Sequence, residues 1–176
     1  SCEPDCLVEP NCWLQVAAGD YHTCGVRTDG SIACWGNNGS GQSTPPAGAF
    51  SPVAAGGSHT CGVKTDGSVA CWGASNAGQV TPPGGTFSQV AVGRAHTCGV
   101  RTDGSVACWG DPTSGQSTPP GGTFSQVAAG HDQTCGVKAD ASVECWGDNT
   151  WGQSTPPGGA FSQVAASLDF HGAEFL

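Results

Sequence analysis

Eleven cysteines are the residues of this chain with the clearest chemistry, and eight of them recur in pairs at one spacing. Nine residues separate the members of a pair, and the pairs return every 37 residues. Zinc sites favour closer cysteines, as in Cys-x-x-Cys, whereas this spacing suits two adjacent strands joined by a turn. The pattern therefore predicts disulfides and no metal site, with the pairs Cys24–Cys34, Cys61–Cys71, Cys98–Cys108 and Cys135–Cys145.

The turn between paired cysteines follows from Asp29-Gly30, a strong hairpin signal between short runs of strand-forming residues. A three-residue loop over 28–30, with Gly30 left-handed, places Cys24 directly opposite Cys34. Opposed Cα atoms of an antiparallel pair lie about 4.5–5.5 Å apart, which a disulfide accepts. A two-residue loop would misalign the sulfur atoms, so we predict the three-residue loop.

The other three cysteines, Cys2, Cys6 and Cys12, lie in an N-terminal extension over residues 1–13 that does not share the repeat. Three is an odd number, so at most one disulfide forms among them. The remaining thiol is free, pairs with a cysteine elsewhere in a longer chain, or forms an intermolecular disulfide.

The 37-residue period is itself the signature of a repeat architecture. Each copy opens with a short apolar strand, as at 14–18, continues into the cysteine hairpin, and ends in a polar loop whose Pro-Pro sequence excludes helix. The sequence therefore predicts an all-β domain of four three-stranded repeats over residues 14–166, with a tail over 167–176. A fifth opening strand begins at Ser162 and no hairpin follows it.

Several residues besides the cysteines return at fixed offsets; in the first copy they are Gly19, His22, Asp29-Gly30, Trp35-Gly36 and Gly41-Gln42. This pattern resembles the repeat of the regulator of chromosome condensation family, and its short length resembles the secreted bacterial members. The resemblance implies a β-propeller whose blades are small antiparallel sheets. Family propellers usually have seven blades, so a closed ring of four, a ring of two chains and an open assembly all remain compatible with this sequence.

Residues of one type at one repeat position are predicted to have structural roles. His22, His59 and His96 share a position at which the fourth copy has Gln133, a replacement that a metal or catalytic ring would not tolerate. Aromatic residues that occur once per copy are predicted to pack between blades; they are Trp35, Trp72, Trp109, Trp146, Phe50, Phe87, Phe124 and Phe161.

Residues that break the repeat are the candidates for binding. Trp151 stands in a polar loop where the other copies have serine or alanine, and an exposed aromatic residue is a typical contact residue. Tyr21 and Arg94 also differ from their counterparts and are added to the candidate contact residues. Asn38 begins the sequon Asn38-Gly39-Ser40 and is a candidate glycosylation site.

Composition excludes several classes of function. The net charge is −9, and four of the five basic residues occupy one hairpin position, so no basic stripe remains for nucleic acid or an anionic membrane. No apolar run is long enough to span a bilayer. Abundant cysteine without methionine indicates a secreted chain. No nucleophile elbow, phosphate loop or zinc-protease motif occurs, so neither catalysis nor a cofactor is expected.

We therefore expect a secreted, non-enzymatic module that binds a protein or a glycan through its propeller loops. The alternative is a structural subunit of an extracellular assembly, in which copies of the chain join through their terminal segments.

Overall fold

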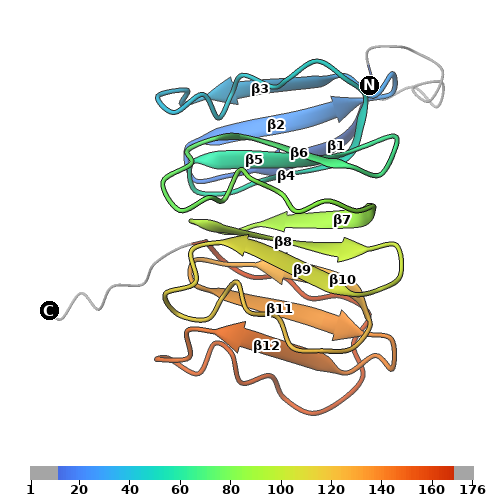
Figure 1. Cartoon of the computed structure of the whole chain (residues 1–176), viewed down its shortest axis with the longest axis vertical. Coiled ribbons are helices and arrows are strands. Elements are labelled where there is room, and N and C mark those ends of the chain that lie inside the picture. The colour runs from blue at the N-terminus through green and yellow to red at the C-terminus, as the bar shows by residue number, and fades with distance from the viewer. Residues whose placement is uncertain (1–11, 169–176) are drawn as a thin grey trace, which may run out of the picture.

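A computed structural model of the chain describes residues 12–168 and contains only β structure among its regular elements. Each repeat forms one three-stranded antiparallel sheet, here called a blade, with its strands in chain order (Figure 1). The strands are β1 (Trp13–Ala18), β2 (His22–Arg27) and β3 (Ile32–Gly36) in blade 1; β4 (Phe50–Ala55), β5 (His59–Lys64) and β6 (Val69–Gly73) in blade 2; β7 (Phe87–Val92), β8 (His96–Arg101) and β9 (Val106–Gly110) in blade 3; and β10 (Phe124–Ala129), β11 (Gln133–Lys138) and β12 (Val143–Gly147) in blade 4. The predicted fold class is confirmed.

The hairpin that joins the second and third strands of each blade has the predicted three-residue loop. Gly30 has a φ of 80°, and the Arg27 amide donates a hydrogen bond to the Ser31 carbonyl, 2.9 Å away. Cys24 consequently lies opposite Cys34, with Cα atoms 4.1 Å apart, slightly closer than expected. All four hairpins contain the disulfide that the spacing predicts. In the fourth hairpin the left-handed position is held by Ala141, with a φ of 67°.

The hydrophobic core lies between blades. Cys24 and Val26 of blade 1 pack against Phe50, Val53 and Trp72 of blade 2, all of them buried. The Phe50 and Trp72 rings meet edge to face with centroids 6.0 Å apart, a favourable geometry for aromatic pairs. Equivalent clusters join blade 2 to blade 3 and blade 3 to blade 4. The predicted packing role is therefore confirmed for Phe50, Phe87, Phe124, Trp72, Trp109 and Trp146. It is wrong for Trp35, which is 49% exposed because no blade precedes it in the described chain.

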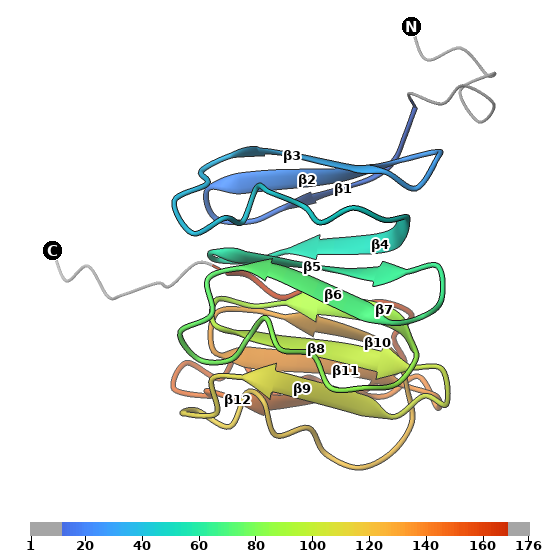
Figure 2. The same ribbon diagram turned by 45° about the horizontal axis from the view of Figure 1, so that its top comes forward.

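The blades form an open series, and blades 1 and 4 lie at its opposite ends (Figures 1 and 2). The first strand of each blade, here called the lead strand, contacts the lead strand of the next blade. Residues 1–11 and 169–176 lie outside the described residues, so the domain boundaries that follow residues 13 and 166 remain predictions. Nothing in residues 12–168 forms a helix that could cross a membrane.

Neighbouring blades approach most closely at glycines that follow the lead strands. A Cβ atom on Gly56 would lie 2.2 Å from the Gly93 carbonyl oxygen, and one on Gly19 would lie equally close to the Gly56 oxygen. The close approach allows backbone hydrogen bonds between blades, as from the Asp20 amide to Gly56 at 3.2 Å. Glycine is required here for space, not for a left-handed backbone.

We expect Gly56→Ala to lower the free energy of unfolding by about 2–3 kcal/mol, because the added methyl group forces two blades apart. Gly84→Ala is the matched control, since a Cβ at Gly84 meets no atom within 4 Å. Urea unfolding of both variants measures the difference. Equal stability of the two variants would contradict the close approach.

Replacing both cysteines of the second hairpin removes a closed loop from the unfolded chain. Cys61→Val with Cys71→Val is expected to lower the free energy of unfolding by about 2.5–3 kcal/mol, on the loop-entropy argument. Valine keeps apolar volume at the buried Cys61 position. The decrease in the free energy of unfolding therefore reflects the lost covalent link more than lost packing. Urea unfolding without reductant tests this, and an unchanged midpoint would show that the disulfide adds little.

Candidate binding surfaces

Each interface between blades contains one buried polar junction. In the first, the Thr60 hydroxyl donates to the Gln42 carbonyl oxygen at 3.1 Å, and the Trp72 indole Nε1–H donates to the same oxygen at 2.9 Å. Because the single Thr60 proton is thus committed, His22 Nε2, 2.7 Å from the hydroxyl oxygen, must be the donor to it. One carbonyl oxygen therefore receives two donors from the following blade.

The same junction recurs at the other two interfaces, with His59, Thr97, Gln79 and Trp109, and with His96, Thr134, Gln116 and Trp146. These histidines therefore have the structural role that the sequence predicts. Gln133 replaces histidine where no further hairpin follows in the described chain to supply a threonine. Its Oε1 instead accepts a hydrogen bond from the Asp132 amide at 3.2 Å.

Burial keeps the junction histidines neutral. Desolvation lowers the pKa of His59 to about 3 and that of His96 to about 4. It also lowers the pKa of His22. Within the described residues, the Nδ1 atom of each of the three rings is buried without a hydrogen-bond partner, so a proton there would have no acceptor. The three rings are therefore placed to pack in the neutral state and not to transfer protons.

The lead strands are linked by a second device, a glutamine side chain that bonds to the backbone of the next lead strand. Gln15 Nε2 donates to the Val53 carbonyl oxygen and Gln15 Oε1 accepts from the Val53 amide, both at 2.9 Å. Gln89 makes the same two bonds to Val127, at 3.1 and 3.0 Å. Pro52 occupies the equivalent position in blade 2 and has no side-chain amide. The amide side chains thereby cover backbone groups on the free edge of a strand.

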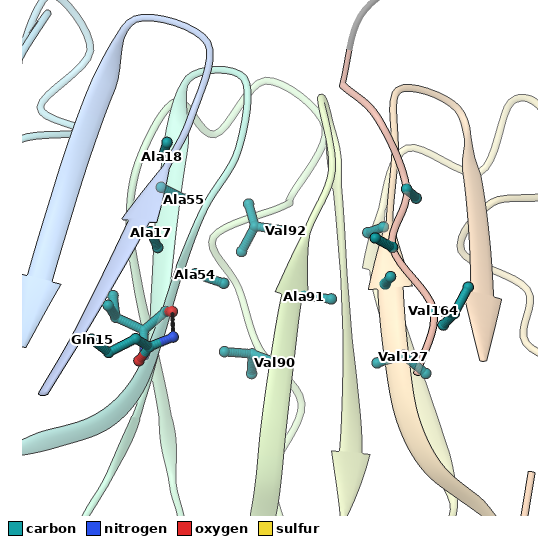
Figure 3. A pocket seen from close by; sticks show the side chains of 15 residues that line it. Gln15, Ala17, Ala18, Ala54, Ala55, Val90, Ala91, Val92, Val127 and Val164 are labelled. Carbon is teal, nitrogen blue, oxygen red and sulfur yellow. Dashed lines mark hydrogen bonds between the residues drawn. The ribbon is translucent and has the colours of Figure 1, made fainter. Parts of the chain in front are cut away.

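A groove of about 300 Å³ runs along these lead strands (Figure 3). Valine and alanine form most of its lining, and Gln15 is its only polar lining side chain among the described residues. Its amide already bonds to Val53, so the groove offers no free polar side chain to orient a ligand. Residues 12–168 also contain no cluster of three metal-ligating side chains.

The three contact candidates lie on one rim of the array, here called the loop rim. Within each repeat, the turn after the lead strand is joined to the loop after the third strand, as by the bond from the Asn37 amide to the Tyr21 carbonyl at 2.8 Å. Tyr21 belongs to this rim in blade 1, Arg94 in blade 3, and Trp151 in the loop after blade 4. All three side chains are exposed, but they come from different blades and form no single cluster across the rim.

The loop that holds Trp151 has the conformation of its counterparts. The Trp151 amide donates to Gln153 Oε1 at 2.8 Å, as the Ser40 amide donates to Gln42 and the Ser114 amide to Gln116. The fold thus fixes the backbone and leaves the indole 69% exposed. The predicted contact role of Trp151 remains a prediction.

The predicted glycosylation site lies in the first of these loops. Asn38 is exposed, and its side-chain amide donates to Thr44 Oγ1 at 2.9 Å while its oxygen accepts from the Ser43 amide. Asn149 makes the same contacts in the fourth loop, although it does not belong to a sequon. A local structural role therefore accounts for asparagine at this position, and glycosylation of Asn38 remains a prediction.

The structure exposes one surface that sequence reasoning missed, the side of blade 1 that faces away from blade 2. Trp13, Val16 and Trp35, here called the first-blade face, are 46%, 57% and 49% exposed. Their counterparts in blade 2 are 1–8% exposed: Phe50, Val53 and Trp72. The sequence contained a signal, because residues 1–34 include no Gly-Gln sequence that could supply the Trp35 indole with a carbonyl oxygen.

Two of the three N-terminal cysteines lie outside the described residues. Cys12 is disulfide-bonded, whereas Cys2 and Cys6 lie outside the described residues. The intermolecular disulfide therefore remains a prediction.

Comparisons with known proteins agree with this architecture. The family model of the regulator of chromosome condensation (RCC1) repeat matches residues 13–42, 53–79 and 87–116. This shows RCC1-type repeats over these residues, and the fourth blade has the same architecture. No curated protein sequence matches the chain.

Two similar crystal structures come from plant receptor kinases. The CRINKLY WD40 ectodomain of ACR4 from Arabidopsis thaliana is 31% identical with a TM-score of 0.72, and the match covers 89% of this chain and 56% of that one. The ectodomain of CR4 from Physcomitrella patens is 26% identical with a TM-score of 0.74, covering 89% and 46%. This chain thus spans about half the length of these structures.

Prp20p from Saccharomyces cerevisiae, described with its binding to Gsp1p and histones, is 17% identical with a TM-score of 0.69. The match covers 81% of this chain and 46% of Prp20p. At this identity the likeness shows the propeller-type fold alone.

The junction histidines predict a loss of stability in acid. Below pH 6.5 the unfolded chain takes up protons that folded His59 does not bind until about pH 3, so stability falls as the pH falls through this interval. We expect His59 to account for a loss on the order of 2–3 kcal/mol between about pH 7 and pH 4.5.

His59→Gln, which copies the glutamine found as Gln133 in the fourth repeat, removes the titrating ring and keeps a side-chain donor. Urea unfolding at both pH values should therefore show a smaller drop for the variant than for the wild type. Identical pH dependence of the two chains would contradict the buried, neutral state of His59.

Proposed function

We propose that this chain is an extracellular, non-enzymatic module that binds another protein through its loop rim. The observation that carries the proposal is its 31% identity to a receptor-kinase ectodomain over 89% of its length. A disulfide in every blade supports an oxidising compartment. The neutral, buried histidines and the absence of a metal-ligand cluster among residues 12–168 give no support to catalysis.

The loop rim is the part of the surface best suited to recognition. Its backbone is fixed by the blades, while its exposed side chains differ from repeat to repeat. An indole held on an ordered loop offers a large apolar contact area at little entropic cost, as in typical interface hot spots. Arg94 adds a planar cation on the same rim. Trp151 and Arg94 are therefore the residues we assign to partner contact.

A pairwise binding screen against purified extracellular domains from the source organism tests this proposal. For a partner found in the screen, Trp151→Ala and Arg94→Ala should each weaken binding about ten-fold, equivalent to about 1.4 kcal/mol. Ser114→Ala is the matched control because Ser114 holds the Trp151 position in the third repeat loop. Binding that both variants leave unchanged would contradict the loop rim as the contact surface.

A glycan array run with the same variants tests whether the ligand is a glycan and not a protein. Glycan binding that depends on Trp151, without any protein partner, would replace the protein-binding proposal. Thiol titration of native, untreated protein tests the extracellular placement, which predicts no reactive thiol from the four hairpins.

A second candidate function is a structural subunit of an extracellular assembly. The observation that favours it is the first-blade face, which leaves two tryptophans and a valine about half exposed. Exposed apolar groups whose counterparts are buried in blades 2, 3 and 4 point to an interface.

A further inference from the structure

The two ends of the array differ in how they are covered. Blade 1 exposes the first-blade face, whereas blade 4 carries a segment of chain, residues 161–167, on the side where a fifth blade would pack. This terminal segment contains Gln163-Val164-Ala165-Ala166, identical in sequence to residues 15–18 of β1. The last part of the described chain therefore has the sequence of a lead strand.

The terminal segment also makes the hydrogen bonds of a lead strand. The Val164 amide donates to Gln126 Oε1 at 2.9 Å, just as the Val53 amide donates to Gln15. The Phe161 amide donates to the Ala141 carbonyl at 2.8 Å, in the manner of Phe50 with the hairpin turn before it. The terminal segment thus occupies the position of the lead strand of a fifth blade (Figure 3).

In the described chain the fifth blade is incomplete. No strand forms over residues 161–168, and no hairpin follows them in the described chain. Gln153, whose counterparts are buried under the threonine and tryptophan of the next blade, is only partly buried. Blade 4 consequently presents the acceptor half of an interface, while blade 1 presents Trp35, a residue of the donor half.

We propose that the first-blade face of one chain docks on blade 4 of a second copy, where the terminal segment occupies the place that β1 of the incoming chain would take. The interface is the one already built three times within the chain, and the incoming Trp35 would donate to the Gln153 carbonyl. The inference rests on the second candidate function, since it names the site of self-association.

This arrangement makes the terminal segment a competitor of assembly. The segment and β1 carry the same four residues for the same position, but only a complete blade buries the two exposed tryptophans. The contact is head to tail and joins different surfaces, so it can continue from chain to chain unless its rotation closes a ring. Each copy carries a net charge of −9, and physiological salt is needed to screen the repulsion between copies.

The experiment uses sedimentation velocity of the full chain at about 0.15 M salt, where the Debye length is about 8 Å. Val164→Asp weakens the hold of the terminal segment on blade 4. We expect this variant to associate at a concentration about ten-fold lower than the wild type, equivalent to about 1.4 kcal/mol. Adding Trp35→Arg should restore a species of 17.5 kDa. Adding Trp151→Arg instead should leave the association unchanged, since that tryptophan is exposed but lies on the loop rim.

Circular dichroism and thiol titration establish that each variant is folded. Association that persists with Trp35→Arg would overturn this site but leave self-assembly standing. Monomers of every variant at all concentrations would overturn both the site and the second candidate function, without bearing on partner binding at the loop rim. Protection of Trp35 from oxidation by N-bromosuccinimide in the monomer would show that residues 1–11 cover the face, and would also overturn the inference.

Discussion

One carbonyl oxygen at each interface holds neighbouring blades together. The Gln42 oxygen accepts hydrogen bonds from the Thr60 hydroxyl and the Trp72 indole N–H of blade 2. His22 of blade 1 donates in turn to the Thr60 hydroxyl oxygen. An unpaired buried donor costs about 1–3 kcal/mol, so each group requires its partner in the adjacent repeat. The repeat sequence is therefore constrained by its neighbours, and one blade alone cannot satisfy it.

At the two ends of the series, residues of the repeat have no partner from an adjacent blade in the described chain. Gln133 replaces histidine where the described chain supplies no further threonine, and Trp35 stays half exposed where the described chain has no preceding glutamine loop. Ser167 takes the position of the glycines that approach the next blade, and no further blade follows it in the described chain. These features thus lie where the described chain supplies no neighbouring blade.

Within a blade, the sequence predicts the structure closely, because the contacts are local. The spacing of Cys24 and Cys34 about Asp29-Gly30 determines the loop, the register and the disulfide. Between blades the sequence is less informative. The angle of one sheet to the next depends on contacts such as Gln15 with Val53, 38 residues apart, which no local pattern reveals. The missing Gly-Gln sequence before Trp35 becomes meaningful only once the structure shows that the Gln42 carbonyl accepts from the buried Trp72 indole.

Proline at position 52 has a consequence for the interface between blades 2 and 3. Blades 1 and 2 are tied through Gln15, and blades 3 and 4 through Gln89, but the lead strands of blades 2 and 3 have no such tie. Among the described residues, no glutamine side chain of blade 2 covers the backbone of Val90 as Gln15 covers that of Val53. The interface between blades 2 and 3 therefore relies more heavily on its buried polar junction and its apolar cluster than the two interfaces beside it.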